Sequence, residues 1–165
     1  MISVKRILVP TDFGEAAGAA VDYARELARM FNARLILLHV VDDLALVSAG
    51  IDGYVGAYPD LQRDAERDAR GRLDELVRPE DVRALGAESI LLKASAPAVA
   101  IVDYAKEAAI DLIVMGTHGR GPITHLLMGS VAERVVRTAP CPVLTVKHPE
   151  HEAVLADALA RIATA

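Results

Sequence analysis

The sequence predicts an α/β fold, with a single doubly wound open sheet of five parallel strands and helices on both faces. The first observation is that short apolar segments alternate with segments of helical period along the chain. The second is that the longest apolar run, residues 35–41, is nearly continuous, which is typical of a strand buried on both faces. This alternation indicates parallel pairing with right-handed crossovers, and ligands of such sheets bind beyond the carboxyl ends of strands where the strand order reverses.

The first strand and the first helix are predicted from the opening residues. Residues 4–10 (VKRILVP) have an apolar centre, and Pro10 ends the strand. Asp12 and Glu15 then form an approximate capping box for a helix. The helix should stop near Asn32, because asparagine tolerates the left-handed conformation. Its apolar stripe is Ala17, Ala20, Val21, Ala24, Leu27, Ala28 and Phe31.

The next part of the chain contains the second and third strands. The second strand is predicted at residues 34–41. Residues 42–60 carry glycines, a proline and tyrosines that break any single period, so they are expected to form a surface connection, with a lid over a site as the alternative. A helix at residues 60–78, with acidic and arginine side chains on a solvated face, should end at Pro79. The third strand is predicted at residues 88–93.

Two further strands and two helices follow. A helix at residues 97–108 has Pro97 in its first turn, where the missing N–H does no harm. A strand at residues 111–115 leads into a glycine-rich loop, and Ser130 opens another helical pattern. The last strand is predicted at residues 142–147 (PVLTVK).

The composition limits the classes of function. A net charge of -5 argues against a protein that binds the nucleic-acid backbone, and the absence of Trp with only two Phe leaves few platforms for stacked bases. The single cysteine, Cys141, excludes an internal disulfide, stands between two prolines, and is interpreted as a packed thiol. Because this single cysteine leaves no internal disulfide, a reducing cytoplasm is the expected compartment, and neither a signal peptide nor a membrane span is expected.

The most informative stretch is residues 111–131, DLIVMGTHGRGPITHLLMGSV. Gly116, Gly119 and Gly129 lie between a strand and a helix start. Such a loop favours a bound anion, because glycine allows close approach of backbone N–H groups and the helix start adds unpaired donors. A Walker A loop is absent, and the first strand is not followed by a dinucleotide fingerprint. The loop therefore predicts a phosphate-bearing ligand and favours a mononucleotide.

Single residues of this constellation keep two interpretations. Ser130 with Glu133 reads as a capping box, yet its hydroxyl could also face a ligand. Asp12 could accept both hydroxyls of a ribose or cap the first helix. Arg120 could lie along phosphates or be solvated, and His118 has no partner spacing that suggests a metal or a catalytic triad. No catalytic residue and no metal-ligand set is predicted.

These residues closely resemble the universal stress protein family, and specifically its ATP-binding branch. The signature of that branch, G-x2-G-x9-G-[S/T], is matched by Gly116, Gly119, Gly129 and Ser130. The segments ILVPTDFG, LLHV, VMGTHGRG and PCPVLTVK match as well, and the resemblance covers residues 4–147.

The resemblance implies a Rossmann-like sheet in the order 3-2-1-4-5, similar to that of the adenine nucleotide alpha hydrolases. ATP, accompanied by Mg²⁺, would lie between the first and fourth strands, with Asp12 on the ribose. Pro10, Thr11, Val40 and Met115 would line the adenine and sugar pocket. Gly116, His118, Gly119, Arg120, Gly129, Ser130 and Val131 would surround the phosphates.

The resemblance also implies a homodimer that pairs through the last strand, Pro142 to Lys147. Residues 1–148 would be the universal stress protein domain, and residues 149–165, which have helical spacing, would extend it. The favoured hypothesis is a cytoplasmic, ATP-binding homodimeric switch or adaptor of the stress response, acting on a protein partner that the sequence does not identify. The alternatives are a slow ATPase, which lacks an evident base and the SGGxDS-type loop, and a nucleotide-free dimeric interaction module, against which the glycine signature counts.

Overall fold

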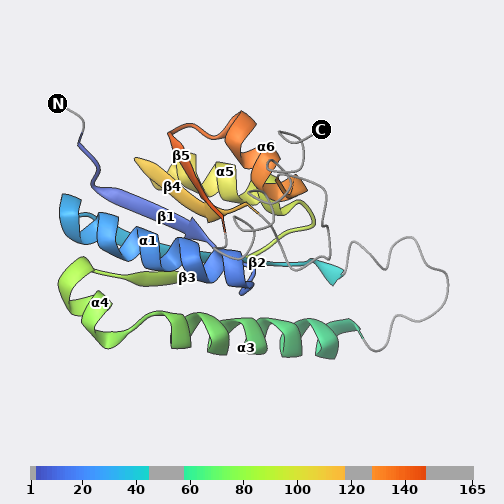
Figure 1. The fold of residues 1–165 in the computed structure, drawn as a ribbon. Helices are drawn as coiled ribbons and strands as arrows, with labels where there is room; N and C mark the ends of the chain where they lie inside the picture. The colour runs from blue at the N-terminus through green and yellow to red at the C-terminus, as the bar shows by residue number, and fades with distance from the viewer. Residues whose placement is uncertain (1–2, 45–57, 118–127, 148–165) are drawn as a thin grey trace, which may run out of the picture.

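The computed structural model describes residues 3–44, 58–117 and 128–147. Within these residues the chain forms a five-stranded sheet in the order β3-β2-β1-β4-β5, and the strand pairs are all parallel (Figure 1). The strands are β1 (Arg6–Pro10), β2 (Arg34–Val41), β3 (Glu88–Lys93), β4 (Leu112–Gly116) and β5 (Val143–Val146). The predicted fold class and the implied strand order are therefore confirmed.

Helices cover both faces of this sheet. The helices are α1 (Glu15–Phe31), α3 (Tyr58–Leu76), α4 (Pro79–Leu85), α5 (Pro97–Glu107) and α6 (Ser130–Thr138). Figure 1 shows α1 and α3 on one side of the strands and α5 and α6 on the other. The sheet is thus the middle one of three layers, which leaves its carboxyl edge as the place where loops from both faces meet.

The strand sequences divide the core in two, because successive side chains point to opposite faces. Ile7 and Val9 of β1 belong to one apolar cluster, together with Ala20 of α1 and Leu73 of α3. Leu8, between them, belongs to the other cluster, which includes residues of α5 and α6. All three β1 side chains are fully buried, and burial of each contributes about 1.5–3 kcal/mol. β1 is therefore held from both faces, directly below the turn that follows it.

The ends of α1 agree with the sequence at one terminus only. Asn32 ends the helix in the left-handed conformation, with φ 51°, and Ala33 N–H donates to Ala28 O at 2.9 Å. The predicted capping box at the other end was wrong. Gly14 is the N-cap and no side chain caps the helix. Asp12 Oδ1 instead accepts the N–H of Gly14 at 2.9 Å, in a turn before the helix.

A short helix, α4, was not predicted. Pro79 was interpreted as the end of the preceding helix, whereas it forms the first turn of α4, which ends at Gly86 with φ 56°. Asp81 anchors α4 on α1, since its Oδ2 accepts from Arg25 Nε at 2.7 Å. Asp81 and Arg25 are only 1% and 4% exposed, so this is a buried ion pair.

Two predicted segments lie outside the described residues. They are most of the 42–60 connection, with its alternative as a lid, and the helical extension at residues 149–165. Both stay predictions, as does the domain boundary at residue 148. Among the described helices, none has the length and apolar character that a bilayer crossing requires.

Candidate nucleotide site

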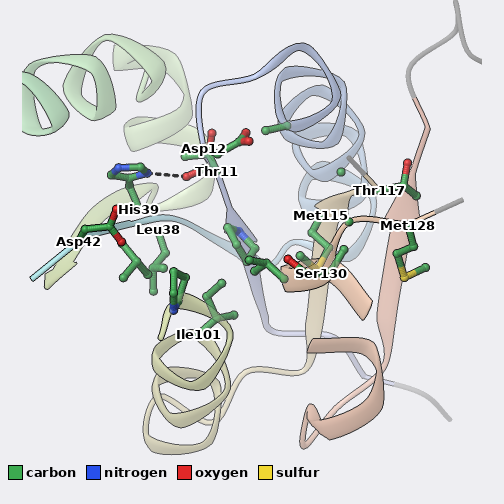
Figure 2. Close-up of a pocket in the computed structure, with 18 residues that line it drawn as sticks. Thr11, Asp12, Leu38, His39, Asp42, Ile101, Met115, Thr117, Met128 and Ser130 are labelled. Atoms are coloured by element: carbon green, nitrogen blue, oxygen red, sulfur yellow. Dashed lines mark hydrogen bonds between the residues drawn. The ribbon is translucent and has the colours of Figure 1, made fainter. Parts of the chain in front are cut away.

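A cavity of about 390 Å³ opens at the carboxyl ends of β1 and β4 (Figure 2). β1 pairs with β2 on one side and with β4 on the other, so the strand order reverses at this point. Spacing alone did not establish that β1 and β4 are neighbours, and the structure confirms the adjacency that the resemblance implied. The volume lies within the range of about 300–1,000 Å³ that is usual for small-molecule sites.

Most of the predicted site residues line this one cavity. They are Pro10, Thr11, Asp12, Val40, Met115, Gly116, Gly129, Ser130 and Val131. The remaining three, His118, Gly119 and Arg120, lie outside the described residues. The structure therefore brings together the two groups of residues, after β1 and around the start of α6, that the sequence placed more than a hundred positions apart.

Other lining residues were missed by the sequence reasoning. They are Ala17, Leu38, His39, Asp42, Pro97, Ile101, Thr117, Met128 and Ala132. The β2 residues could have been found, because the rule that ligands bind beyond strand ends applies to β2 as it does to β1. Pro97 and Ile101 carry no such signal, since their approach depends on how α5 crosses the sheet.

The turn after β1 is held by its own polar groups. Thr11 N–H donates to Leu38 O at 2.8 Å, and Thr11 Oγ1 accepts from Phe13 N–H at 3.0 Å. Asp12 Oδ1 accepts from Gly14 N–H at 2.9 Å. In the described part of the chain, Asp12 Oδ2 has no hydrogen-bond partner. One carboxylate oxygen therefore fixes the turn, and the other can accept hydrogen bonds from a ligand.

The start of α6 supplies donors at the opposite side of the cavity. Gly129 is the N-cap, and the predicted capping box of Ser130 was wrong, because Ser130 is already the first helical residue and no side chain caps the helix. The first intrahelical bond runs from Glu133 N–H to Gly129 O at 2.9 Å. The N–H groups of Ser130 and Val131 precede it and have no acceptor within the helix, which suits an anion.

The sequence of the chain is similar to the sequences of known proteins. A model of the Universal stress protein family matches residues 3–147. The chain belongs to the universal stress protein family. Universal stress protein MJ0531 of Methanocaldococcus jannaschii is 33% identical over 148 residues, which cover 90% of this chain and 85% of that relative. A universal stress protein of Thermus aquaticus is 35% identical over 145 residues, which cover 87% of this chain and 98% of the relative.

Solved structures of this family share the fold. Protein MJ0577 of Methanocaldococcus jannaschii aligns with a TM-score of 0.74 at 28% identity, over 88% of this chain and 97% of that one. A universal stress protein described as a complex with cAMP aligns with a TM-score of 0.57 at 27% identity, over 88% of this chain and 98% of that one. At least one family member with a similar fold is thus described in complex with a cyclic nucleotide.

Gly116 of this universal stress protein has a packing role. A Cβ at this position would lie 2.7 Å from the carbonyl carbon of Ala16 and 2.9 Å from the Ala16 carbonyl oxygen. The interpretation that Gly116 serves the approach of a ligand is therefore incomplete. Its missing side chain lets the first turn of α1 rest directly on the end of β4.

A backbone hydrogen bond joins the two ends of the glycine loop. Gly129 N–H donates to Thr117 O at 2.6 Å, while Thr117 N–H donates to Val146 O at 3.0 Å. Thr117, directly after β4, is therefore bonded both to Gly129, the N-cap of α6, and to β5. This arrangement fixes the start of α6 at the end of β4.

The apolar walls of the cavity come from both sides of the reversal point. Leu38, Ile101 and Met115 are 0%, 3% and 5% exposed, so they present a firm apolar surface. Figure 2 shows Leu38 and Ile101 on one side of the cavity, Met115 and Ser130 together on the other, and Asp12 above and between them. An elongated ligand with an apolar end, a hydroxylated middle and an anionic end matches this order.

Cys141 is not among the residues that line this cavity; it is half-buried and packs against the apolar cluster that includes residues of α5 and α6. Burial raises the pKa of its thiol, and the nearby Asp111 carboxylate raises it further. Both effects keep the thiol protonated, in agreement with its interpretation as a packed residue. Within residues 3–44, 58–117 and 128–147, no group of three His, Cys, Asp or Glu side chains could hold a metal ion.

Proposed function

We propose that this universal stress protein binds ATP in the cavity between β1 and β4 and acts in the cytoplasm as a homodimeric, nucleotide-dependent switch or adaptor. The observation that carries the proposal is the order of groups along the cavity. The cavity has an apolar wall, then a carboxylate with one unengaged oxygen, and then the uncapped N-terminus of α6. The base, ribose and phosphates of a nucleotide follow one another in the same order.

The residues divide between the three parts of ATP. Leu38, Val40 and Met115 would pack against the adenine, whose faces are apolar. Asp12 Oδ2 would accept the ribose hydroxyls, and hydrogen bonds to a charged group contribute about 1.5–3 kcal/mol each. The Ser130 hydroxyl and the N–H groups of the first α6 turn would face the phosphates, because this helix end carries a partial positive charge.

The remaining site assignments stay part of this proposal. Pro10 and Thr11 would lie along the sugar, and Gly116, Gly129 and Val131 near the phosphates. His118, Gly119 and Arg120 would contact the phosphates as the resemblance implies. Mg²⁺ would arrive with ATP, since this ion usually takes phosphate oxygens and water as most of its ligands. The relative described as a complex with cAMP supports an adenine nucleotide as the ligand class.

A binding role is favoured over an enzymatic one. The described side chains at the phosphate end are Ser130, Thr117 and Met128, and none of these is an ordinary general base. We therefore assign no catalytic residue. The bound nucleotide would stabilise one conformation of the glycine loop, and a protein partner would bind to that conformation.

The dimer would form through β5. This strand is the edge of the sheet, next to β4, and Leu144 in its centre is 39% exposed. An apolar edge strand with unpaired backbone groups is suited to pairing with a second copy. Pro142 to Lys147 is accordingly the proposed interface.

A thermal-shift series with ATP, ADP, AMP and cAMP tests the ligand. At one hundred times Kd a ligand stabilises by about 2.7 kcal/mol, which raises Tm by roughly 5–10 °C in a chain of this size. The largest shift is expected with ATP, and no shift with any nucleotide at millimolar concentration would contradict the proposal. A larger shift with cAMP or AMP than with ATP would transfer the assignment to that nucleotide.

A glycine variant tests the loop. Gly119→Val should abolish the shift while the protein without nucleotide keeps its fold, because a branched side chain blocks approach of the backbone to phosphate. Gly18→Ala is the matched control, since an added Cβ on α1 meets nothing within 4 Å. It should leave the nucleotide shift unchanged, and an unfolded Gly119→Val protein would instead indicate a structural role for this glycine.

A further inference from the structure

His39 stands where the ladder between β1 and β2 ends. Pro10 and Leu38 form the last register pair, and the next residue, Thr11, still donates its N–H to Leu38 O at 2.8 Å. The carbonyl oxygen of Thr11 lies 2.7 Å from Nδ1 of the His39 imidazole (Figure 2). Consecutive residues of β2 therefore hold both main-chain polar groups of Thr11.

The direction of this hydrogen bond follows from its chemistry. A carbonyl oxygen only accepts, so Nδ1 of His39 carries the hydrogen and donates it. The neutral ring can do this in one tautomer, with Nε2 unprotonated, and the charged ring can do it as well. The bond consequently survives protonation of His39.

The imidazole is held in place by its neighbours. Its ring lies 4.4 Å from the ring of Phe13, centroid to centroid, at an interplanar angle of 40°. The Arg72 guanidinium, from α3, lies over the Phe13 ring at 4.2 Å from its centroid. Phe13 itself has φ 64°, which is uncommon for a bulky residue. Side chains from β2 and α3 thus hold the turn that carries Asp12 in place.

The Thr11 carbonyl belongs to the peptide bond that leads into Asp12. Fixing this carbonyl fixes the peptide plane, and Asp12 Oδ1 is fixed in turn by Gly14 N–H at 2.9 Å. From this geometry we propose that His39 is a positioning residue, which orients Asp12 toward the sugar of a bound nucleotide through the Thr11 carbonyl. The inference rests on the proposed function, because the nucleotide is the ligand that Asp12 would hold.

Two variants separate the hydrogen bond from the ring. His39→Phe keeps a flat ring against Phe13 but has no donor, whereas His39→Asn keeps an N–H near the position of Nδ1. By calorimetry with ATP, His39→Phe should bind about tenfold more weakly, the equivalent of one net hydrogen bond. His39→Asn should stay within about threefold of the wild type, because its amide can still donate to the carbonyl.

A double-mutant cycle shows whether His39 acts through Asp12. In an Asp12→Asn background the carboxylate is gone, so His39→Phe should cost little further affinity. Equal losses in both backgrounds would show that His39 supports the cavity in general and would overturn the inference. If the wild-type protein binds ATP and the His39→Phe variant binds it with the same affinity, the inference is overturned as well, while the proposed function stays intact.

The wild-type protein supplies a second readout that needs no variant. Nitrogen-15 NMR of the imidazole should show the Nδ1–H tautomer of His39 when the ring is neutral. The Nε2–H tautomer would overturn the inference, even where His39→Phe fails to fold, because Nδ1 would then have no hydrogen to donate. Wild-type protein without affinity for ATP or another nucleotide would overturn both the proposed function and this inference.

Discussion

Replacing Gly116 by alanine should lower the free energy of unfolding of the nucleotide-free protein by about 1–3 kcal/mol, the usual cost of inserting a carbon into a packed site. The added Cβ would lie 2.7 Å from the carbonyl carbon of Ala16 and 2.9 Å from its carbonyl oxygen. These are backbone atoms of α1, which cannot swing aside as the end of a flexible side chain can. Either α1 or the end of β4 must therefore shift.

Urea unfolding without nucleotide measures this cost, with Gly18→Ala as the control. Gly18 lies on the same helix as Ala16, and an added Cβ there meets nothing within 4 Å. Alanine at this position should stabilise the protein by about 0.5–1 kcal/mol, because glycine weakens a helix interior. The dependence on urea should keep the same slope in both variants, which shows that only stability has changed.

One combination of results would refute the packing argument. If Gly116→Ala unfolds at the wild-type urea concentration but loses the thermal shift with ATP, then Gly116 serves the ligand and not the contact with α1. The original interpretation from the glycine signature would then be correct. Loss of stability with a retained ATP shift would support the packing role alone.

Three further predictions concern the core, the thiol and the dimer. Asp81→Asn should destabilise by about 3 kcal/mol in urea melts, because it leaves the buried Arg25 charge without its closest partner, and a loss below about 1 kcal/mol would contradict this. Stability should fall as pH rises through about 8.5 and above, because the native pKa of Cys141 is raised and the unfolded chain releases this proton first. Cys141→Ala should remove that part of the pH dependence, and an unchanged profile would exclude the thiol as its source. Leu144→Lys should yield monomers in light scattering, whereas Val99→Lys, on α5 and equally exposed at 39%, should not; dimers in both variants would place the interface elsewhere.

The strands were predictable because a strand that is buried on both faces has a nearly continuous apolar sequence. The run at residues 34–41 is β2 without any change of bounds, and the strand at residues 88–93 is β3. Helix ends were less predictable, since one residue type serves several purposes. Pro79 can stop a helix or begin one, and the structure uses it to begin α4. The strand order came from the resemblance and not from any periodicity.

The residues of the candidate site were likewise predictable only where a local sequence signal exists. Residues carried by a local signature, such as Asp12 and Ser130, were placed correctly at the cavity but assigned the wrong local bonds. In both cases a carboxylate or hydroxyl three residues before a glutamate suggested a capping box, while the structure uses a glycine, Gly14 or Gly129, as the N-cap. Ile101 left no local signal, because its place in the wall is decided by the packing of α5 on the sheet.

The bond between Gly129 N–H and Thr117 O has a consequence for how this fold can diversify. The chain leaves the sheet at Thr117 and re-enters the fold at Gly129, and these two points are already joined at 2.6 Å. A change in the length or composition of this connection would then cost the fold little, since doubling a loop adds only about 0.6 kcal/mol of closure entropy, so the fold itself does not require the fixed spacing of the glycine signature. Under the proposed function this connection would face the phosphates, so related chains could exchange the groups that meet them while the strands, the apolar wall and Asp12 stay as they are. Selectivity for the length of a phosphate chain would then be free to evolve independently of the stability of the domain.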